Sequence, residues 1–271
     1  MVDPKAARLH ADTDTTGPQP RGKGIPLTVD TRYVEASPSQ GVGRGATPPK
    51  GLPVGVAERG FLARLPYELI EELIESSRSA SYRIGLILET PTHAGFALIV
   101  SGALRYYLPA ANGRQVTVGY LGPGNVIGTV QNESTAGLRI QVIAATILWH
   151  LQADRVHLLI ERRPEFTQAL LDEATHGLRH SFQVLAASAF TTVRARVARD
   201  IVERVSLSGP LHAGSHLVVT HQSLADATGS VREVVGRELQ NLKDDGVIAT
   251  EVRGVTVLDA DALMRLAGYV I

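Results

Sequence analysis

The sequence predicts an α+β fold with three parts in order: an N-terminal β-roll of the jelly-roll-like type, one long helix, and a C-terminal winged helix-turn-helix. Three observations predict it. Short apolar runs separated by turn residues fill positions 82–151, as in an all-β barrel or roll. Leucines spaced by seven follow Pro164, as in a helix that packs along a partner. Two helical segments around Gly229, followed by a hairpin pattern, complete the chain.

The composition excludes several classes of function. The chain has 271 residues, more than the usual length of about 100 to 200 for one domain, which indicates two modest domains. Its 27 basic and 27 acidic residues cancel, so any binding to nucleic acid must come from a local patch. It has no cysteine, which excludes disulfides, thiolate metal sites and a cysteine nucleophile, and suits a reducing cytoplasm. No secretory signal or membrane span is expected, so we expect a cytoplasmic protein without a membrane partner.

Residues 1–57 hold eight of the 14 prolines and eight glycines, without apolar periodicity. Such a segment cannot bury enough apolar surface to offset its ordering entropy. We expect a disordered leader, with a docked arm as the alternative.

Residues 58–163 carry the pattern of the β-roll. A short amphipathic helix is expected after Pro66, where Leu69 and Leu73 recur at helical spacing. The strands follow from Tyr82 onward. Asn112 and Gly113 predict a hairpin turn between 104–108 and 115–120, because both residue types adopt positive φ at little cost.

Residues 164–190 predict one long helix with an apolar seam. Leu171, Leu178 and Leu185 are spaced by seven, and Phe182 lies four residues after Leu178. This heptad pattern favours a dimer interface. Packing of the helix on its own domain is the alternative.

Residues 191–271 predict a winged helix-turn-helix. Thr220 can cap the first helix, Gly229 supplies the tight turn, and Arg253-Gly254 marks the tip of a β-hairpin wing, after which Asp259 caps a last helix. The side of the second helix expected to be buried holds Val231, Val234, Val235, Leu239 and Leu242. The opposite face then holds Ser230, Arg232, Glu233 and Arg237.

Taken in order, these parts resemble the CRP/FNR superfamily of bacterial transcription regulators over residues 58–271. The motifs that carry the resemblance are SVREVVGRELQNLKDDGVI and FALIVSGALRYYLPAANGRQVTVGYLGPGNVIG. The resemblance implies a cyclic-nucleotide-type sensor roll, a dimerisation helix, and sequence-specific binding of a homodimer to a double-stranded DNA operator. RNA polymerase is an implied partner if the protein is an activator.

The chemistry of the second helix fits base recognition. An arginine such as Arg232 can bind guanine O6 and N7 with both arms, and Glu233 can accept from the cytosine N4 amine. Arg237 can reach a base or a phosphate. The alternative is a solvated helix face with a local ion pair between Arg232 and Glu233. The resemblance also implies phosphate contacts from Thr220, His221, Gln222 and Ser223, which alternatively only cap the helix or are exposed polar residues.

The resemblance further implies an effector pocket, but its nucleotide contacts are degenerate. Thr129 stands where the family's phosphate cassette has a glutamate, and Arg139 lacks a neighbouring hydroxyl. The family's adenine-contacting pair corresponds to Ser181 and Phe182. A buried cyclic phosphate without its partners is costly. We therefore expect no cyclic AMP and either a non-classical small-molecule effector or none, with no cofactor and haem as an alternative.

Two other classes remain open. A metal-dependent, cupin-like enzyme needs two closely spaced strand histidines and a glutamate, whereas His93 stands alone before Leu148. His176 and His180 have helical chelate spacing, but no third ligand is evident, so we expect them to be exposed polar residues. An interaction module that had lost DNA binding is expected to lack Arg232 or Glu233, and both are present.

Overall fold

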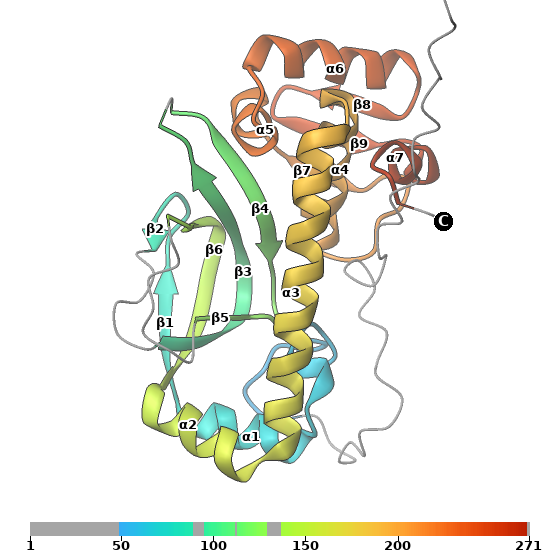
Figure 1. The fold of residues 1–271 in the computed structure, drawn as a ribbon. Coiled ribbons are helices and arrows are strands. Elements are labelled where there is room, and N and C mark those ends of the chain that lie inside the picture. Colours follow the sequence, from blue (N-terminus) through green and yellow to red (C-terminus); the bar gives the residue numbers. More distant parts are fainter. Residues whose placement is uncertain (1–48, 89–94, 112, 129–136, 270–271) are drawn as a thin grey trace, which may run out of the picture.

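The computed structural model describes residues 49–88, 95–111, 113–128 and 137–269, arranged as a β-roll, a long helix and a C-terminal winged helix-turn-helix (Figure 1). The predicted fold class is confirmed. Most of the expected leader, residues 1–48, lies outside the described residues. Residues 49–57 are described, and Val56 and Ala57 are buried in the apolar core. The expected leader therefore ends before residue 57, because Val56 and Ala57 pack in the core of the roll.

The roll is one antiparallel sheet with the strand order β1-β6-β3-β4, in which β2 also pairs with β6 and β5 with β3. The strands are β1 (Ser77–Tyr82), β2 (Ile87–Leu88), β3 (Gly95–Pro109), β4 (Gln115–Leu121), β5 (Val126–Ile127) and β6 (Arg139–Gln152). β1 was not predicted, because its sequence SRSASY offers no large aliphatic residue to mark a buried face.

The predicted hairpin between β3 and β4 is confirmed. Its register runs from Leu104 opposite Leu121 to Pro109 opposite Gln115. The loop closes through a hydrogen bond from the Ala110 amide to the Arg114 carbonyl at 2.8 Å, and Gly113 has a φ of 80°. Asn112 lies outside the described residues. The interior of the roll is filled by aliphatic side chains, among them Ile99, Leu104, Leu121, Ile127, Ile140, Val142 and Leu148.

Two short helices, α1 (Tyr67–Glu75) and α2 (Ala153–Arg162), pack at the end of the roll beside the start of the long helix α3 (Pro164–Phe190) (Figure 1). Phe61 makes edge contacts with Phe96 and Phe166, with ring centroids 5.8 and 5.7 Å apart. The sequence pattern did not predict α2, because only Val156 and Leu159 are buried in it. α3 covers the predicted range 164–190.

The C-terminal part has its own core. It contains α4 (Val193–Ser206), α5 (His221–Thr228), α6 (Arg232–Asp244), α7 (Ala260–Leu266) and a sheet of order β7-β9-β8. The strands are β7 (His216–Val218), β8 (Ile248–Glu251) and β9 (Gly254–Val257). α4 was not predicted, although Val197, Ala198, Ile201 and Val202 are fully buried there. Within the described residues, no helix combines the length and apolarity that a membrane span needs.

Candidate nucleic-acid interface

The first helix of the helix-turn-helix, α5, begins at a capping box. The Thr220 hydroxyl accepts a hydrogen bond from the Ser223 amide at 3.1 Å, and the Ser223 hydroxyl accepts one from the Thr220 amide at 3.3 Å. Each side chain thus pairs an amide that the first turn would otherwise leave without a partner. The expected capping role of Thr220 is confirmed.

The turn between α5 and α6 depends on Gly229. This residue ends α5 in the left-handed region, with φ of 64° and ψ of 25°, which side chains other than glycine adopt at a cost. The Ser230 amide donates to the Ala225 carbonyl at 3.0 Å, and the Thr228 hydroxyl donates to the Leu224 carbonyl at 2.7 Å. These bonds fix the angle at which α6 leaves the turn.

One side of α6 is locked into the C-terminal core. Val235, Leu239 and Leu242 are buried there with Leu224 of α5, and Val234 is partly buried. Val231 was expected on this side, but it is 42% exposed. It occupies the N-cap position in an extended conformation and so lies outside the helical repeat.

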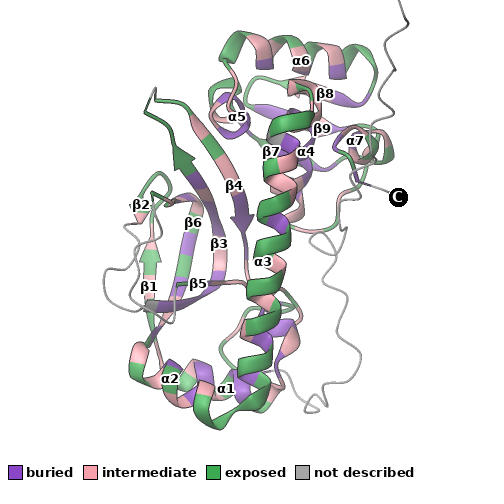
Figure 2. Ribbon diagram, in the orientation of Figure 1, coloured by how far each residue is buried: buried purple, intermediate pink, exposed green. Residues whose placement is uncertain are grey.

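The opposite side of α6 presents charged side chains to solvent. Arg232, Glu233 and Arg237 are exposed, and Ser230 is partly exposed (Figure 2). Among the described residues, the structure records no ion pair between Arg232 and Glu233. Their hydrogen-bonding groups are free to meet base edges or phosphates.

The expected wing is the hairpin of β8 and β9, and its tip is exposed at Val252 and Arg253. Next to the tip, Glu251 at the end of β8 accepts a hydrogen bond from the Thr256 hydroxyl at 2.6 Å and pairs with His216 at 3.3 Å. The Thr256 hydrogen bond, with a smaller contribution from His216, lowers the pKa of Glu251. Arg253 was not singled out from the sequence as a DNA contact, although the Arg-Gly pair at a hairpin tip could have indicated it.

Two of the other candidate phosphate-contacting residues of α5, Gln222 and Ser223, already have intramolecular partners. Gln222 donates to the Asp226 carboxylate at 2.8 Å, and His221 is exposed with its ring close to Gly236. Ser223 is partly buried, and Arg204 donates to its carbonyl at 3.2 Å. Gln222 and His221 therefore remain the more accessible of the three.

Three of the four candidate effector residues, Arg139, Ser181 and Phe182, lie within the described part of the chain. Thr129 lies outside the described residues. Arg139 is exposed, and because Ile140 and Val142 point into the roll, strand alternation directs Arg139 to the outer side. Ser181 donates to the Gly177 carbonyl at 2.9 Å, and Phe182 is exposed.

The candidate seam of α3 is uncovered in the single chain. Leu171, Leu178, Phe182 and Leu185 are 60%, 58%, 62% and 67% exposed. The opposite face of the helix, with Phe166, Ala169, His180 and Ala187, is buried against the same chain.

His180 was expected to be exposed, and this was wrong. It is 8% exposed, and its Nε2 lies 2.8 Å from the Val118 carbonyl oxygen. Burial lowers the pKa of His180, and the neighbouring Glu203 opposes that shift. Across the described residues, no three histidine, aspartate or glutamate side chains gather as metal ligands, so His176 and His180 do not form such a site there.

Comparisons with known proteins agree with this geometry. Residues 195–266 match the family model of the Crp-like helix-turn-helix domain. The chain is 31% identical over 172 residues to the transcriptional regulator LdrP of Thermus thermophilus, covering 62% of this chain and 84% of that protein. It is 28% identical over 180 residues to a CRP-like cAMP-activated global transcriptional regulator of Mycobacterium tuberculosis, covering 63% and 78%.

Solved structures share the fold at lower sequence identity. A c-di-GMP responsive global regulator of Xanthomonas campestris aligns with a TM-score of 0.61 at 21% identity, covering 70% of this chain and 98% of that one. A CRP/FNR family regulator of Thermus thermophilus aligns with a TM-score of 0.59 at 20% identity, covering 70% and 98%.

Proposed function

This chain belongs to the CRP/FNR family of transcription regulators, and on that premise we propose that it binds a specific double-stranded DNA operator as a homodimer. The observation that carries the proposal is the two-sided character of α6. One side is fixed in the C-terminal core by Val235, Leu239 and Leu242, while Arg232, Glu233 and Arg237 are exposed on the other.

The proposed contacts divide by their chemistry. Arg232 and Glu233 lie at the start of α6, the end of a recognition helix that reaches base edges in the major groove. Arg237, with Thr220, His221, Gln222 and Ser223 of α5, is assigned to phosphates or flanking bases. We assign one further phosphate contact to Arg253, which is exposed at the tip of the wing.

Residues 191–271 carry nine basic and ten acidic residues. Non-specific attraction to DNA is therefore weak, and base contacts must supply much of the preference for a site. Two of the acidic residues, Asp200 and Glu203, are paired with Arg204 and Arg199 inside the domain, so these pairs leave its net charge unchanged.

The homodimer is proposed on the α3 seam. Four large apolar side chains stand in one stripe along a helix whose other face is already buried, and a second copy covers such a stripe through heptad packing. The domain division in this proposal keeps 164–190 for the dimer helix and 191–271 for the DNA-binding domain, and it begins the roll before residue 58, because Val56 and Ala57 pack in its core.

The roll is proposed to take a non-classical effector or none. Its interior is filled with aliphatic side chains, and Arg139 does not point into it. RNA polymerase is a partner in this proposal if the protein activates transcription. The regulator relatives support binding rather than catalysis as the activity.

The direct test is selection from a pool of random DNA duplexes with the full chain. We expect one motif to be enriched over rounds of selection. The variant carrying both Arg232→Ala and Arg237→Ala should enrich no motif. If the duplexes recovered with the parent protein share no motif, the proposed function is contradicted.

A further inference from the structure

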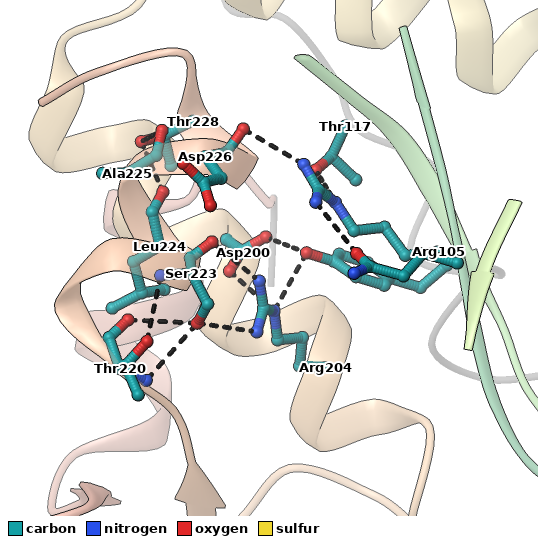
Figure 3. A network of polar contacts seen from close by, with 12 residues as sticks. Arg105, Thr117, Asp200, Arg204, Thr220, Ser223, Leu224, Ala225, Asp226 and Thr228 are labelled. Atoms are coloured by element: carbon teal, nitrogen blue, oxygen red, sulfur yellow. Dashed lines mark hydrogen bonds and ion pairs between the residues drawn. The ribbon is translucent and has the colours of Figure 1, made fainter. Parts of the chain in front are cut away.

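A buried polar cluster joins the β-roll to the DNA-binding domain (Figure 3). Its members are Arg105 of β3, Tyr120 of β4, and Asp200 and Arg204 of α4, and we call it the interdomain latch. Arg105 is 4% exposed, Tyr120 is 1% and Asp200 is 6%. Charged groups so far from water favour an arrangement in which each one keeps its partners.

The Tyr120 hydroxyl makes the first connection. It donates to one oxygen of Asp200 and accepts from Arg204 Nε at 2.9 Å, while Arg204 Nε lies 2.8 Å from the other Asp200 oxygen. The Arg204 guanidinium also stands over the Tyr120 ring, 5.2 Å from its centroid. Burial raises the pKa of the Asp200 carboxyl, although Arg204 opposes that shift.

Arg105 makes the second connection. Its guanidinium is held on the roll by Thr117 at 2.8 Å and Gln115 at 3.0 Å, and its remaining arm donates to the Asp226 carbonyl of α5 at 3.1 Å. The hairpin also approaches the helix-turn-helix directly, since a Cβ at Gly229 would lie 3.6 Å from Val116 Cγ2. The latch therefore holds both α4 and α5.

The two strands of the latch are two-sided. Arg105 and Tyr120 are directly opposite each other on β3 and β4, and so are their neighbours Leu104 and Leu121. Successive side chains on a strand point to opposite faces. The leucine pair accordingly lies in the interior of the roll, and the latch pair faces the DNA-binding domain.

We propose that these four side chains position the DNA-binding domain on the roll for operator binding. In the latched arrangement α6 lies at one end of the molecule and has exposed positions along its length (Figure 2), among them Arg232, Glu233 and Arg237. Releasing the domain lowers the fraction of molecules in this orientation, and apparent affinity falls with that fraction. This inference rests on the proposed function and names the residues that position its DNA-binding domain.

Tyr120→Phe is the sharpest variant, because it keeps the ring and the Asp200–Arg204 pair within α4. It removes only the hydroxyl that joins them to the roll, so undocking then lets water reach Asp200. Tyr82→Phe is the matched control, since its hydroxyl bonds to His150 at 2.8 Å inside the roll. Arg105→Lys is a second variant that keeps the charge but loses the forked geometry.

Two measurements separate the latch from the proposed function. The chain has no cysteine, so spin labels on Val54→Cys and Val252→Cys, both fully exposed, report the distance between roll and wing within one chain when labelled protein is diluted with unlabelled protein. We expect Tyr120→Phe and Arg105→Lys to broaden the distance distribution, and Tyr82→Phe to leave it narrow. On the selected operator, both latch variants should bind about tenfold more weakly, a factor that corresponds to about 1.4 kcal/mol.

Unchanged distances in both latch variants, or unchanged or tighter operator binding, would overturn the proposed latch. A failed selection of an operator overturns the proposed function instead, and the distance measurement still tests the latch without DNA.

Discussion

The exposed residues at the start of α6 differ from the rest of the charged surface because their main chain is fixed from behind. Arg232 follows a turn that is closed by the Ser230–Ala225 hydrogen bond, and Val235 is fully buried one turn later. A fixed main chain removes the backbone part of the entropy cost when these side chains meet a base, which favours specific over diffuse contacts.

Arg232→Ala should weaken binding to the selected operator by about 1 to 3 kcal/mol and relax the preference at one base pair of each half-site. The reason is the loss of a forked contact to a base edge. Competition binding with single-base variants of the site measures both effects. Arg265→Ala, on an exposed arginine of α7, is the control and should change neither. An equal loss on all sequences would make Arg232 a phosphate contact only.

His180 predicts a pH dependence of stability. Burial lowers its pKa below the ordinary value of 6.5. The folded state therefore favours the neutral ring. The contribution of His180 to the free energy of unfolding is fully present above pH 6.5, and it is lost as the pH falls because the unfolded chain binds the proton at a higher pH than the folded chain does. Thermal unfolding between pH 8 and pH 5 should show the parent losing more stability on acidification than His180→Gln. Parallel losses in the two proteins would remove His180 as the source.

Single residues also show where sequence patterns fail. The exposed face of α6 was predictable because helical spacing separates Arg232 and Arg237 from Val235 and Leu239. The burial of His180 and Arg105 was not predictable, because buried polar side chains do not follow the spacing of the apolar core residues. Each is buried through a partner that is remote in sequence, the carbonyls of Val118 and Asp226.

Among the elements, α3 has apolar residues on two opposite faces. Its buried face carries Phe166 and Ala169 in the core of the roll, and its exposed stripe carries Leu178 and Phe182. A helix of 27 residues with both faces apolar is stable in water only when both are covered, which a dimer achieves.

Leu178→Asp should therefore break the proposed dimer. An unpaired carboxylate in an apolar seam costs several kcal/mol, about 3 or more. Light scattering should show a monomer for this variant and a dimer for the parent. Arg179→Asp changes the charge of the adjacent position without entering the seam and should leave the dimer intact. Equal masses for parent and Leu178→Asp would remove the seam from the interface.

The elements that the sequence predicted are those with strong local signals: the Asn112-Gly113 hairpin, the heptad helix, and the glycine turn of the helix-turn-helix. β1, α2 and α4 were missed for different reasons. β1 has small polar residues, α2 is short with two buried side chains, and α4 mixes arginines with valines on faces that only tertiary packing separates.

At the scale of the whole molecule, the roll and the DNA-binding domain are joined by polar contacts between residues far apart in sequence, which no local pattern predicts. Arg105 and Asp226 are 121 residues apart, and Tyr120 and Asp200 are 80 apart. The order of the roll, the long helix and the helix-turn-helix was predictable from the change in residue pattern along the chain, whereas the contacts that join them are visible only in the three-dimensional structure.

The whole protein should bind its operator without added cyclic AMP, although several relatives carry names that describe cAMP activation. Arg139 lies on the outer side of the roll. The loss of a ribose and a phosphate partner should weaken nucleotide binding by at least about 100-fold. Calorimetry with cyclic AMP and cyclic GMP, together with gel shifts in their presence, measures this. Micromolar binding accompanied by a tenfold rise in operator affinity would contradict it.

The central claim is that a symmetric dimer presents two α6 helices to the DNA. The most direct test measures affinity for the selected operator as base pairs are inserted between its half-sites. Two recognition helices on one dimer reach successive major grooves about 10 base pairs apart. The parent should bind the original spacing best and lose most affinity at an insertion of about 5 base pairs, half a helical turn. Affinity that does not change with spacing, or a selected site without twofold symmetry, would contradict the account.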